Sequence, residues 1–246
     1  MIVNESLKRG LRSATVGLNA VLRPVGLHVD LDFTYTASYL FHLENLETRL
    51  DDASGKEDAD FVRRYVPQSA RVLDIGCGGG RVERHLAPHV REAHGCDVAL
   101  QAVKLSRRNC QGLSNAIFTH VKDGPRSVRK VYARDGFDVV FSIATLQHMP
   151  KGEAYLYLEE ASRLLKVGGV ALLHFPNLLS DRNLRVFQEY AHDRNRHLTR
   201  MHHYTPQEVE RLVSAAGLHV DSLQDHYRFK GDLQLVASKP TQEPSG

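Results

Sequence analysis

The sequence predicts an α/β fold in which helices cover both faces of a mainly parallel β-sheet. From residue 67 onward, short apolar runs alternate with segments of helical periodicity, which is the pattern of repeated βαβ units. The first apolar run leads directly into a glycine-rich turn and then a helix, at Val72–Arg81 (VLDIGCGGGR). Glycines at such a turn let the backbone bend tightly and lie close to another group.

The individual elements follow from the same periodicities. Strands are expected at Arg71–Ile75, Glu92–Cys96, Ala116–Val121, Phe137–Ser142, Val170–Phe175, His219–Gln224 and Leu233–Ser238, and helices at Arg81–His89, Leu100–Gln111 and Gly152–Leu165. Residues 166–169 (KVGG) are expected to end the last of these helices and turn into the next strand. A further helix begins at Thr205-Pro206, where the threonine can cap it, and ends at Gly217.

Residues 1–66 precede this pattern and are predicted to form a helical extension to a domain of residues 67–240. Residues 5–23 have the spacing of an amphipathic helix with a basic polar face. This helix is expected to pack on the domain or on the second subunit of a homodimer, and peripheral contact with an anionic membrane surface is the alternative. Residues 31–66 are expected to be helical, with a polar break at 51–57 (DDASGKE).

Composition narrows the class of protein. The 246 residues suffice for one α/β domain with a small cap, and a net charge of +3 is too small to indicate a nucleic-acid partner. The three cysteines form no CxxC pair, which favours reduced thiols in a cytoplasmic protein. No secretory signal is expected, and no run approaches the roughly 20 apolar residues that span a bilayer.

The glycine-rich turn has the features of a nucleotide-binding loop for an unusual nucleoside. Asp97 ends the second strand about 20 residues later, at the spacing of a carboxylate that accepts hydrogen bonds from ribose hydroxyls. Arg81 stands where a dinucleotide loop has a third small residue. Asp74 at the entrance would repel a diphosphate but attract an α-ammonium group. The ligand is therefore expected to be a nucleoside that carries an amino acid, and a nicotinamide oxidoreductase is disfavoured.

These residues resemble the class I S-adenosylmethionine-dependent methyltransferases, particularly small-molecule enzymes of the ubiquinone-biosynthesis type. The matching segments are Asp74–Gly80 (DIGCGGG), Asp97, Asp123-Gly124, Phe137–Ser142 (FDVVFS), Leu146–Met149 (LQHM) and Arg163–Gly169 (RLLKVGG). The resemblance covers roughly residues 60–240. It implies a Rossmann-like seven-stranded sheet of order 3-2-1-4-5-7-6 with the last strand antiparallel.

The resemblance also implies S-adenosylmethionine as cofactor, S-adenosylhomocysteine as product, and a set of site residues. The cofactor-binding residues would be Asp74, Gly76, Cys77, Gly78, Asp97, Val98, Asp123, Gly124, Ser142 and Gln147. Methyl transfer needs no protein nucleophile, but a base helps when the acceptor is a hydroxyl group. His148 is the candidate catalytic base, with a role in shaping its loop as the alternative, and His174 is expected to be a core residue.

Residues 177–204 form a long connection rich in arginine and histidine. We expect a lid on the acceptor side that favours an anionic or polyhydroxylated acceptor, with a solvated basic helix and loop as the alternative. Leu184, Phe187 and Tyr190 are expected to pack down on one helix face. His202 and His203 are adjacent and cannot share a helix face, so no metal site is predicted there.

Two absences bear on the substrate. Ser142–Thr145 (SIAT) stands where enzymes that methylate the amine of a nucleic-acid base carry Asn/Asp-Pro-Pro-Tyr, and there is no Pro-Cys nucleophile for cytosine. Without a basic groove that contains aromatic residues, no nucleic-acid partner is expected. The predicted function is O-methylation of a small molecule, such as a sugar, a natural product or a lipid-linked precursor. The alternatives are N-methylation of a small amine and a regulator that binds the cofactor without catalysis.

Overall fold

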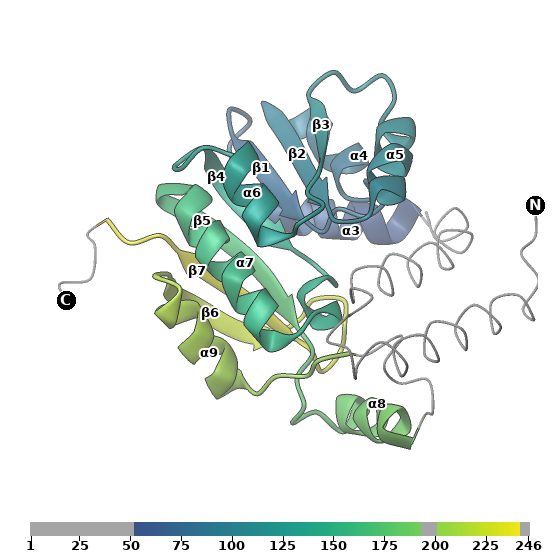
Figure 1. Cartoon of the computed structure of the whole chain (residues 1–246), viewed down its shortest axis with the longest axis vertical. Coiled ribbons are helices and arrows are strands. Elements are labelled where there is room, and N and C mark those ends of the chain that lie inside the picture. Colours follow the sequence, from purple (N-terminus) through teal and green to yellow (C-terminus); the bar gives the residue numbers. More distant parts are fainter. Residues whose placement is uncertain (1–51, 193–200, 242–246) are drawn as a thin grey trace, which may run out of the picture.

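A computed structural model describes residues 52–192 and 201–241, which build a seven-stranded sheet with helices on both faces (Figure 1). The strands are β1 (Arg71–Ile75), β2 (Glu92–Asp97), β3 (Ala116–His120), β4 (Phe137–Ser142), β5 (Leu165–Phe175), β6 (His219–Asp225) and β7 (Leu233–Ser238). Their order is β3-β2-β1-β4-β5-β7-β6, and β7 runs antiparallel to both β5 and β6. The predicted fold class and strand order are confirmed.

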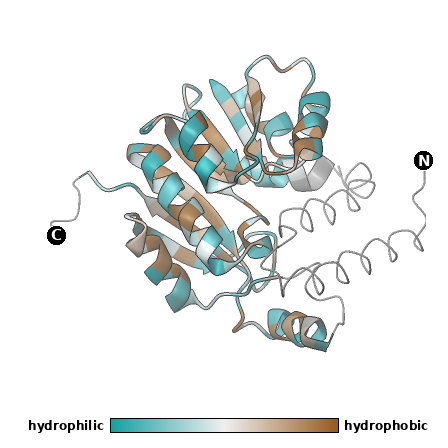
Figure 2. Ribbon diagram, in the orientation of Figure 1, coloured by the Kyte–Doolittle hydropathy of each residue, from teal (hydrophilic) through white to brown (hydrophobic). Residues whose placement is uncertain are grey.

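Helices cover the two faces in separate groups. One face carries α3 (Asp52–Arg63), α4 (Glu83–Leu86) and α5 (Leu100–Asn109), and the other carries α6 (Pro125–Val131), α7 (Lys151–Leu164) and α9 (Pro206–Ala215). Neighbouring residues of one strand therefore enter different cores: Val72 packs toward the α3 and α4 side, whereas Leu73 joins the α7 side. Strands buried on both faces are nearly continuous in apolar residues, as the central strands in Figure 2 are.

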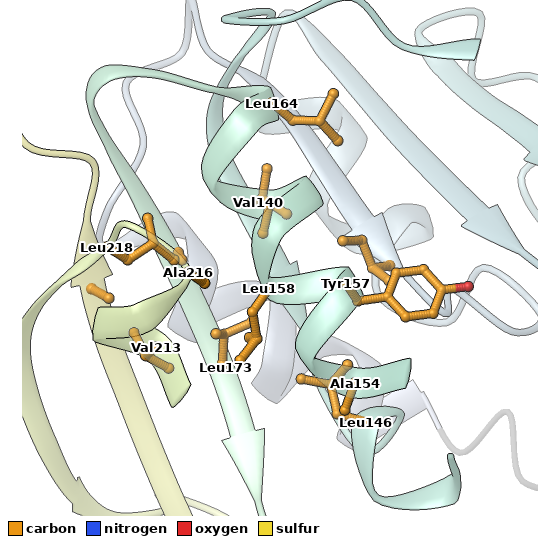
Figure 3. Packing of buried hydrophobic residues seen from close by; sticks show 14 of the residues in the cluster. Val140, Leu146, Ala154, Tyr157, Leu158, Leu164, Leu173, Val213, Ala216 and Leu218 are labelled. Atoms are coloured by element: carbon orange, nitrogen blue, oxygen red, sulfur yellow. The ribbon is translucent and has the colours of Figure 1, made fainter. Parts of the chain in front are cut away.

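The core on the second face holds α7 and α9 against the sheet. Leu158 of α7, Leu173 of β5 and Val213 of α9 are buried in one cluster (Figure 3). α9 starts with the expected cap: Thr205 Oγ1 accepts from the Glu208 N–H at 3.2 Å, and the Glu208 carboxylate accepts from the Thr205 N–H at 2.9 Å. This reciprocal pair satisfies two backbone donors at the start of the helix.

Several predicted boundaries are wrong. β5 begins at Leu165, because residues 166–169 form an irregularity within the strand, where the pairing with β4 shifts between Phe137 and Val139. α3 runs without interruption through part of the expected polar break, since its polar residues face charged partners: Lys56 pairs with Asp60 one turn away. The helix expected from Arg81 starts at Glu83 and ends as the 3-10 turn Ala87–His89, and α6 was not predicted.

Other expectations fall partly outside the described residues. These include the helix of residues 5–23, with its membrane or homodimer contact, and most of the extension 1–66. In the connection after β5, α8 (Asp181–His192) is present, but Leu184 and Phe187 remain 43% and 47% exposed, so the expectation that they pack down is wrong. Among the residues described, none of the helices combines the length and apolarity needed to cross a bilayer.

Candidate functional site

The glycine-rich turn after β1 is bound to the end of β2. The N–H groups of Gly76 and Cys77 both donate to the Cys96 carbonyl, at 2.8 and 3.1 Å. Gly76 has a φ of +83°, and a Cβ there would lie 2.1 Å from the Thr145 side chain, so only glycine fits. The Thr145 hydroxyl in turn donates to the Gly76 carbonyl at 3.1 Å. The turn is therefore in direct contact with the segment that follows β4.

Asp97 at the end of β2 holds this turn from the other side. Its carboxylate accepts the N–H of Gly78 at 3.0 Å and that of Ala99 at 2.8 Å. The side chain is buried, and burial raises the pKa of Asp97 to about 6 although the two N–H donors favour the charged form. Each oxygen keeps a further lone pair for a ligand hydroxyl. Val98 follows half-buried, and its carbonyl accepts from His120 Nε2 at 3.0 Å.

Two acidic side chains lie buried together beneath the turn. Asp74 of β1 and Glu83 of α4 are both buried, and no group in the described part of the chain forms a hydrogen bond with Asp74 Oδ1 or with either Glu83 oxygen. Burial raises the pKa of Glu83 to about 7, and burial together with the Glu83 charge raises the pKa of Asp74 well above its ordinary value. Two carboxyl groups this close favour a shared proton. Cys77, also buried nearby, has a thiol pKa that burial raises in the same way.

We expect Glu83→Gln to stabilise the protein above neutral pH. A carboxyl whose pKa rises on folding holds its proton more tightly in the folded state, so the free energy of unfolding falls as the pH climbs from 4.5 toward about 7. Glutamine removes this loss and can donate to Asp74. The variant should gain up to about 3 kcal/mol over wild type at pH 8. The difference should be smallest near pH 5, as urea unfolding at both pH values would show.

Glu92 supplies the matched control for this experiment. Hydrogen bonds from His94 and Arg71 hold the pKa of Glu92 below its ordinary value, which is the opposite direction. The charged form of Glu92 therefore stabilises the fold at pH values above its pKa. Glu92→Gln should be less stable than wild type at pH 8. A Glu83→Gln protein that is also less stable than wild type at pH 8 would contradict the shared-proton pair.

Asp58 joins three segments that lie far apart in the sequence. This fully buried carboxylate of α3 accepts two hydrogen bonds from Arg228, at 2.9 and 2.7 Å, and pairs with Arg81 at 2.5 Å. The Tyr227 hydroxyl also donates to it. Burial would raise the pKa of Asp58, but Arg81 and Arg228 outweigh it and hold the pKa below its ordinary value. Asp58 thus anchors the start of α4 and the β6–β7 loop to α3.

Asp123 and Gly124 follow β3 at the same edge of the sheet. The Asp123 side chain is exposed and accepts from the Ser127 hydroxyl at 3.3 Å. Gly124 has a φ of +57°, and a Cβ there would lie 3.3 Å from the Tyr157 hydroxyl oxygen and from a Glu153 carboxylate oxygen, both on α7. The Val121 N–H donates to the Asp97 carbonyl at 3.0 Å, which joins the two strand ends.

The segment after β4 carries the candidate base. Ser142 is buried, and its hydroxyl donates to the Ile75 carbonyl of β1 at 2.8 Å. The segment then forms a 3-10 turn, Leu146–His148, in which His148 is exposed. Gln147 is buried; its Nε2 lies 3.3 Å from His148 Nε2, and its Oε1 has no partner in the described part of the chain.

All of the predicted site residues lie at one edge of the sheet, where β1 to β4 end. Sequence reasoning missed Thr145, Glu83 and Asp58, although an acid in the first turn of the helix after the glycines was a readable signal for Glu83. A cavity of about 570 Å³ opens at the opposite edge, beside Arg163, Gly217 and Lys239, and contains none of these residues. Within residues 52–192 and 201–241, no three His, Cys, Asp or Glu side chains are grouped as metal ligands.

Comparison with known sequences identifies the family of the chain. Residues 44–223 match the sequence model of the family described as "Methyltransferase domain". A relative from Xylella fastidiosa, "Ubiquinone biosynthesis O-methyltransferase", is 32% identical over 113 residues, which are 45% of this chain and 44% of that protein. The match therefore spans less than half of the relative.

Two solved structures share the fold at low sequence identity. A SAM-dependent methyltransferase from Methanosarcina mazei is 20% identical with a TM-score of 0.60, covering 74% of this chain and 98% of its own. The magnesium protoporphyrin IX methyltransferase of Synechocystis, solved with bound SAH, is 17% identical with a TM-score of 0.60, covering 75% and 83%. By the family match over most of its length and by its strand order, the chain belongs to the class I S-adenosylmethionine-dependent methyltransferases.

Proposed function

We propose that the chain transfers the methyl group of S-adenosylmethionine to an oxygen atom of a small-molecule acceptor. The observation that carries the proposal is the position of His148, an exposed histidine on the segment that Thr145 ties to the glycine-rich turn. Ligands of open α/β sheets gather at this edge. The name of the Xylella relative, an O-methyltransferase, supports oxygen as the accepting atom.

The residues at the turn fit a cofactor with a ribose at one end and a cationic amino acid at the other. Asp97 would accept from the ribose hydroxyls, and Asp74, whose Oδ1 lacks a donor, would attract the ammonium group with Gly76, Cys77 and Gly78 around it. The remaining contacts would come from Val98, Asp123 and Gly124 at the adenine and from Ser142 and Gln147 near the sulfonium. When bound, the cofactor supplies an electrophilic methyl group that an acceptor can take in a single displacement.

His148 would take the proton that leaves the acceptor. The Gln147 amide nitrogen can only donate, so its contact with His148 Nε2 needs a lone pair on that ring nitrogen. The neutral ring is what a general base requires: as the acceptor oxygen bonds to the methyl carbon and the methyl–sulfur bond breaks, Nε2 would exchange the Gln147 contact for the proton of the acceptor. Ser142, whose hydroxyl holds the end of β4 against β1, would keep the segment in place.

Residues 177–204 would form a lid over the acceptor side. Arg182 and Arg185 of α8 are exposed and would attract an anionic or polyhydroxylated acceptor. Arg196 and Arg200, which belong to the same proposal, lie outside the described residues. Unchanged acceptor affinity after replacing Arg182 and Arg185 with alanine would contradict the lid.

The experiment that tests the function is incubation with methyl-labelled S-adenosylmethionine and a metabolite extract, followed by mass spectrometry of the labelled products. The proposal predicts a methyl ether or ester together with S-adenosylhomocysteine. Label on a nitrogen atom would overturn O-methylation. Tight cofactor binding without transfer to any compound would overturn catalysis and favour a cofactor-binding regulator.

We expect Asp97→Ala to bind S-adenosylhomocysteine at least about 100-fold more weakly, because the two ribose hydroxyls lose the charged acceptor to which they would donate and the Gly78 N–H loses its acceptor as well. Calorimetric titration measures the affinity, and circular dichroism checks that the fold is retained. Asp221→Ala, on β6 far along the sheet, is the control and should bind like wild type. Undiminished affinity of Asp97→Ala would show that the site lies elsewhere.

A further inference from the structure

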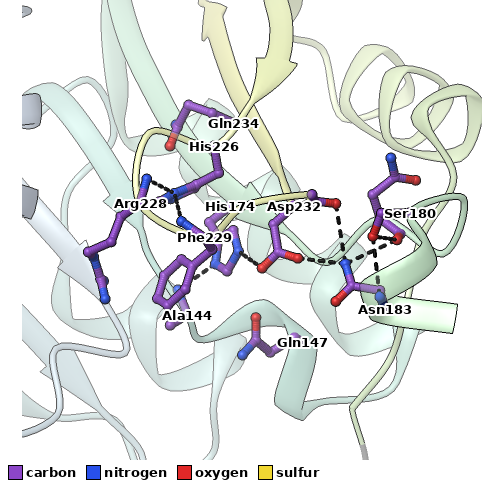
Figure 4. A network of polar contacts seen from close by, with 12 residues as sticks. Ala144, Gln147, His174, Ser180, Asn183, His226, Arg228, Phe229, Asp232 and Gln234 are labelled. Atoms are coloured by element: carbon purple, nitrogen blue, oxygen red, sulfur yellow. Dashed lines mark hydrogen bonds and ion pairs between the residues drawn. The ribbon is translucent and has the colours of Figure 1, made fainter. Parts of the chain in front are cut away.

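A buried polar cluster joins the segment after β4 to α8 and to the β6–β7 loop (Figure 4). His174, the second-last residue of β5, is at its centre and is only 1% exposed. Its Nδ1 accepts the N–H of Ala144 at 3.0 Å, and its Nε2 lies 2.8 Å from Asp232 Oδ2. Because Nδ1 accepts, the neutral ring carries its proton on Nε2 and donates it to Asp232. The expectation that His174 is a core residue is confirmed, and its two nitrogens have separate tasks.

Asp232 and Asn183 extend the cluster to the lid segment. The Asn183 amide, also buried, donates to Asp232 Oδ1 at 2.6 Å and to the carbonyl oxygens of Asn177 and Gly231 at 3.0 and 3.3 Å. Burial would raise the pKa of Asp232, but the donors His174 and Asn183 outweigh it, so the carboxylate stays charged. The segments after β4 and after β5 and the β6–β7 loop are thereby joined, directly or through Asp232, to the His174 ring.

The backbone that His174 holds is strained. Ala144 has a φ of +58°, in the left-handed region that is unfavourable for a residue with a Cβ. Such a conformation persists only where its surroundings enforce it. The next residue, Thr145, reaches the glycine-rich turn, and Gln147 and His148 follow within one further turn.

The ring's apolar contacts do not require a histidine. The Phe229 ring stacks on it with the ring centroids 4.8 Å apart, and the His226 ring meets it edge-on with the centroids 4.5 Å apart. A phenylalanine at position 174 would make the same two contacts. Burying an imidazole and a carboxylate instead carries a desolvation cost that packing alone does not justify. What the histidine adds is an acceptor, Nδ1, for the N–H of Ala144.

We propose that His174 and Asp232 are positioning residues for methyl transfer, which hold Ala144 in its left-handed conformation and so place Thr145–His148 against the glycine-rich turn. The inference rests on the proposed function in taking this segment as the acceptor side. Asp232 sets the orientation of the ring, and the ring sets the backbone. Neither residue needs to touch the acceptor or the cofactor.

Two variants of His174 separate its two nitrogens. In His174→Asn, the side-chain oxygen can stand near the place of Nδ1 and still accept from Ala144, but the contact with Asp232 is lost. In His174→Gln, the amide nitrogen can stand near the place of Nε2 and still donate to Asp232, but nothing accepts from Ala144. Both variants replace the same ring and remove the same aromatic contacts, so each controls for the other.

The expected results differ between the pair. His174→Gln should lower kcat by at least about tenfold, because a small displacement of reacting groups is enough for such a loss. Its affinity for S-adenosylhomocysteine should fall by a smaller factor than kcat, because Asp97 and the glycines keep their places and only the contact from Gln147 is displaced. His174→Asn should keep most of kcat. Hydrogen exchange at the amides of residues 144–148 should be faster in His174→Gln than in His174→Asn.

Equal effects of the two variants on kcat and on exchange would overturn the proposal and leave His174 with a packing role. The exchange measurement needs no acceptor, so it decides the proposal even if O-methylation fails. If His174→Gln does not fold, Asp232→Asn replaces it: exchange at residues 144–148 should rise, and wild-type exchange there would overturn the positioning role.

Discussion

Replacing Asp58 with alanine is expected to lower the free energy of unfolding by about 3–5 kcal/mol, the cost of leaving buried charges without their counter-ion. Both Arg81 and Arg228 direct guanidinium groups at this single carboxylate, and the Tyr227 hydroxyl loses its acceptor at the same time. A loss of this size is a large part of the stability of a typical domain. Urea unfolding of the two proteins at neutral pH measures it.

Asp60, on the same helix, provides the control. Its carboxylate is 40% exposed and pairs with Lys56 and Arg63 at the surface, where ion pairs contribute little. Asp60→Ala should therefore have nearly the same free energy of unfolding as wild type. If the two alanine variants have the same stability, Asp58 does not anchor these segments.

His148→Gln is expected to lower kcat for O-methylation by about 100-fold or more, the usual contribution of a positioned general base. Glutamine retains the size and polarity of the side chain but cannot accept a proton near neutral pH. Affinity for S-adenosylhomocysteine should not change, because Asp97 and the glycine-rich turn are untouched. Steady-state rates with the acceptor found by mass spectrometry measure kcat, and calorimetric titration measures the affinity.

His219→Gln tests whether the loss is specific to the candidate base. His219 lies on the outer strand β6 with a side chain that is 72% exposed, so its replacement should leave kcat as in wild type. A His148→Gln enzyme with wild-type kcat would remove His148 from the chemistry. A loss of kcat together with a matching loss of cofactor affinity would assign it to binding instead.

The parts of the fold that depend on local sequence were predictable. The glycine-rich turn and Asp97 follow from periodicity and from spacing within a single βαβ unit, and the structure places them in direct contact. The strand order was implied by the resemblance to class I methyltransferases, and it is confirmed. The bounds of β1 and β4 are those predicted, because both strands are short apolar runs between clear breaks.

The parts that depend on distant residues were not predictable. Asp58 and Arg228 are 170 positions apart, and nothing near either residue signals the other. The His174–Asp232 pair likewise spans 58 positions, so the sequence identified a buried histidine but not its second partner or its hold on Ala144.

The place of β7 in the sheet affects how the chain folds as it is made. β5 ends at Phe175, but β7, its neighbour, begins only at Leu233, after β6 has been synthesised. β6 pairs with β7 alone, so it cannot join the sheet first. During synthesis, which proceeds from the N-terminal side, β5 therefore keeps an unpaired edge of backbone N–H and carbonyl groups. Such edges pair with other chains, so the nascent protein is most prone to aggregate in the interval between β5 and β7.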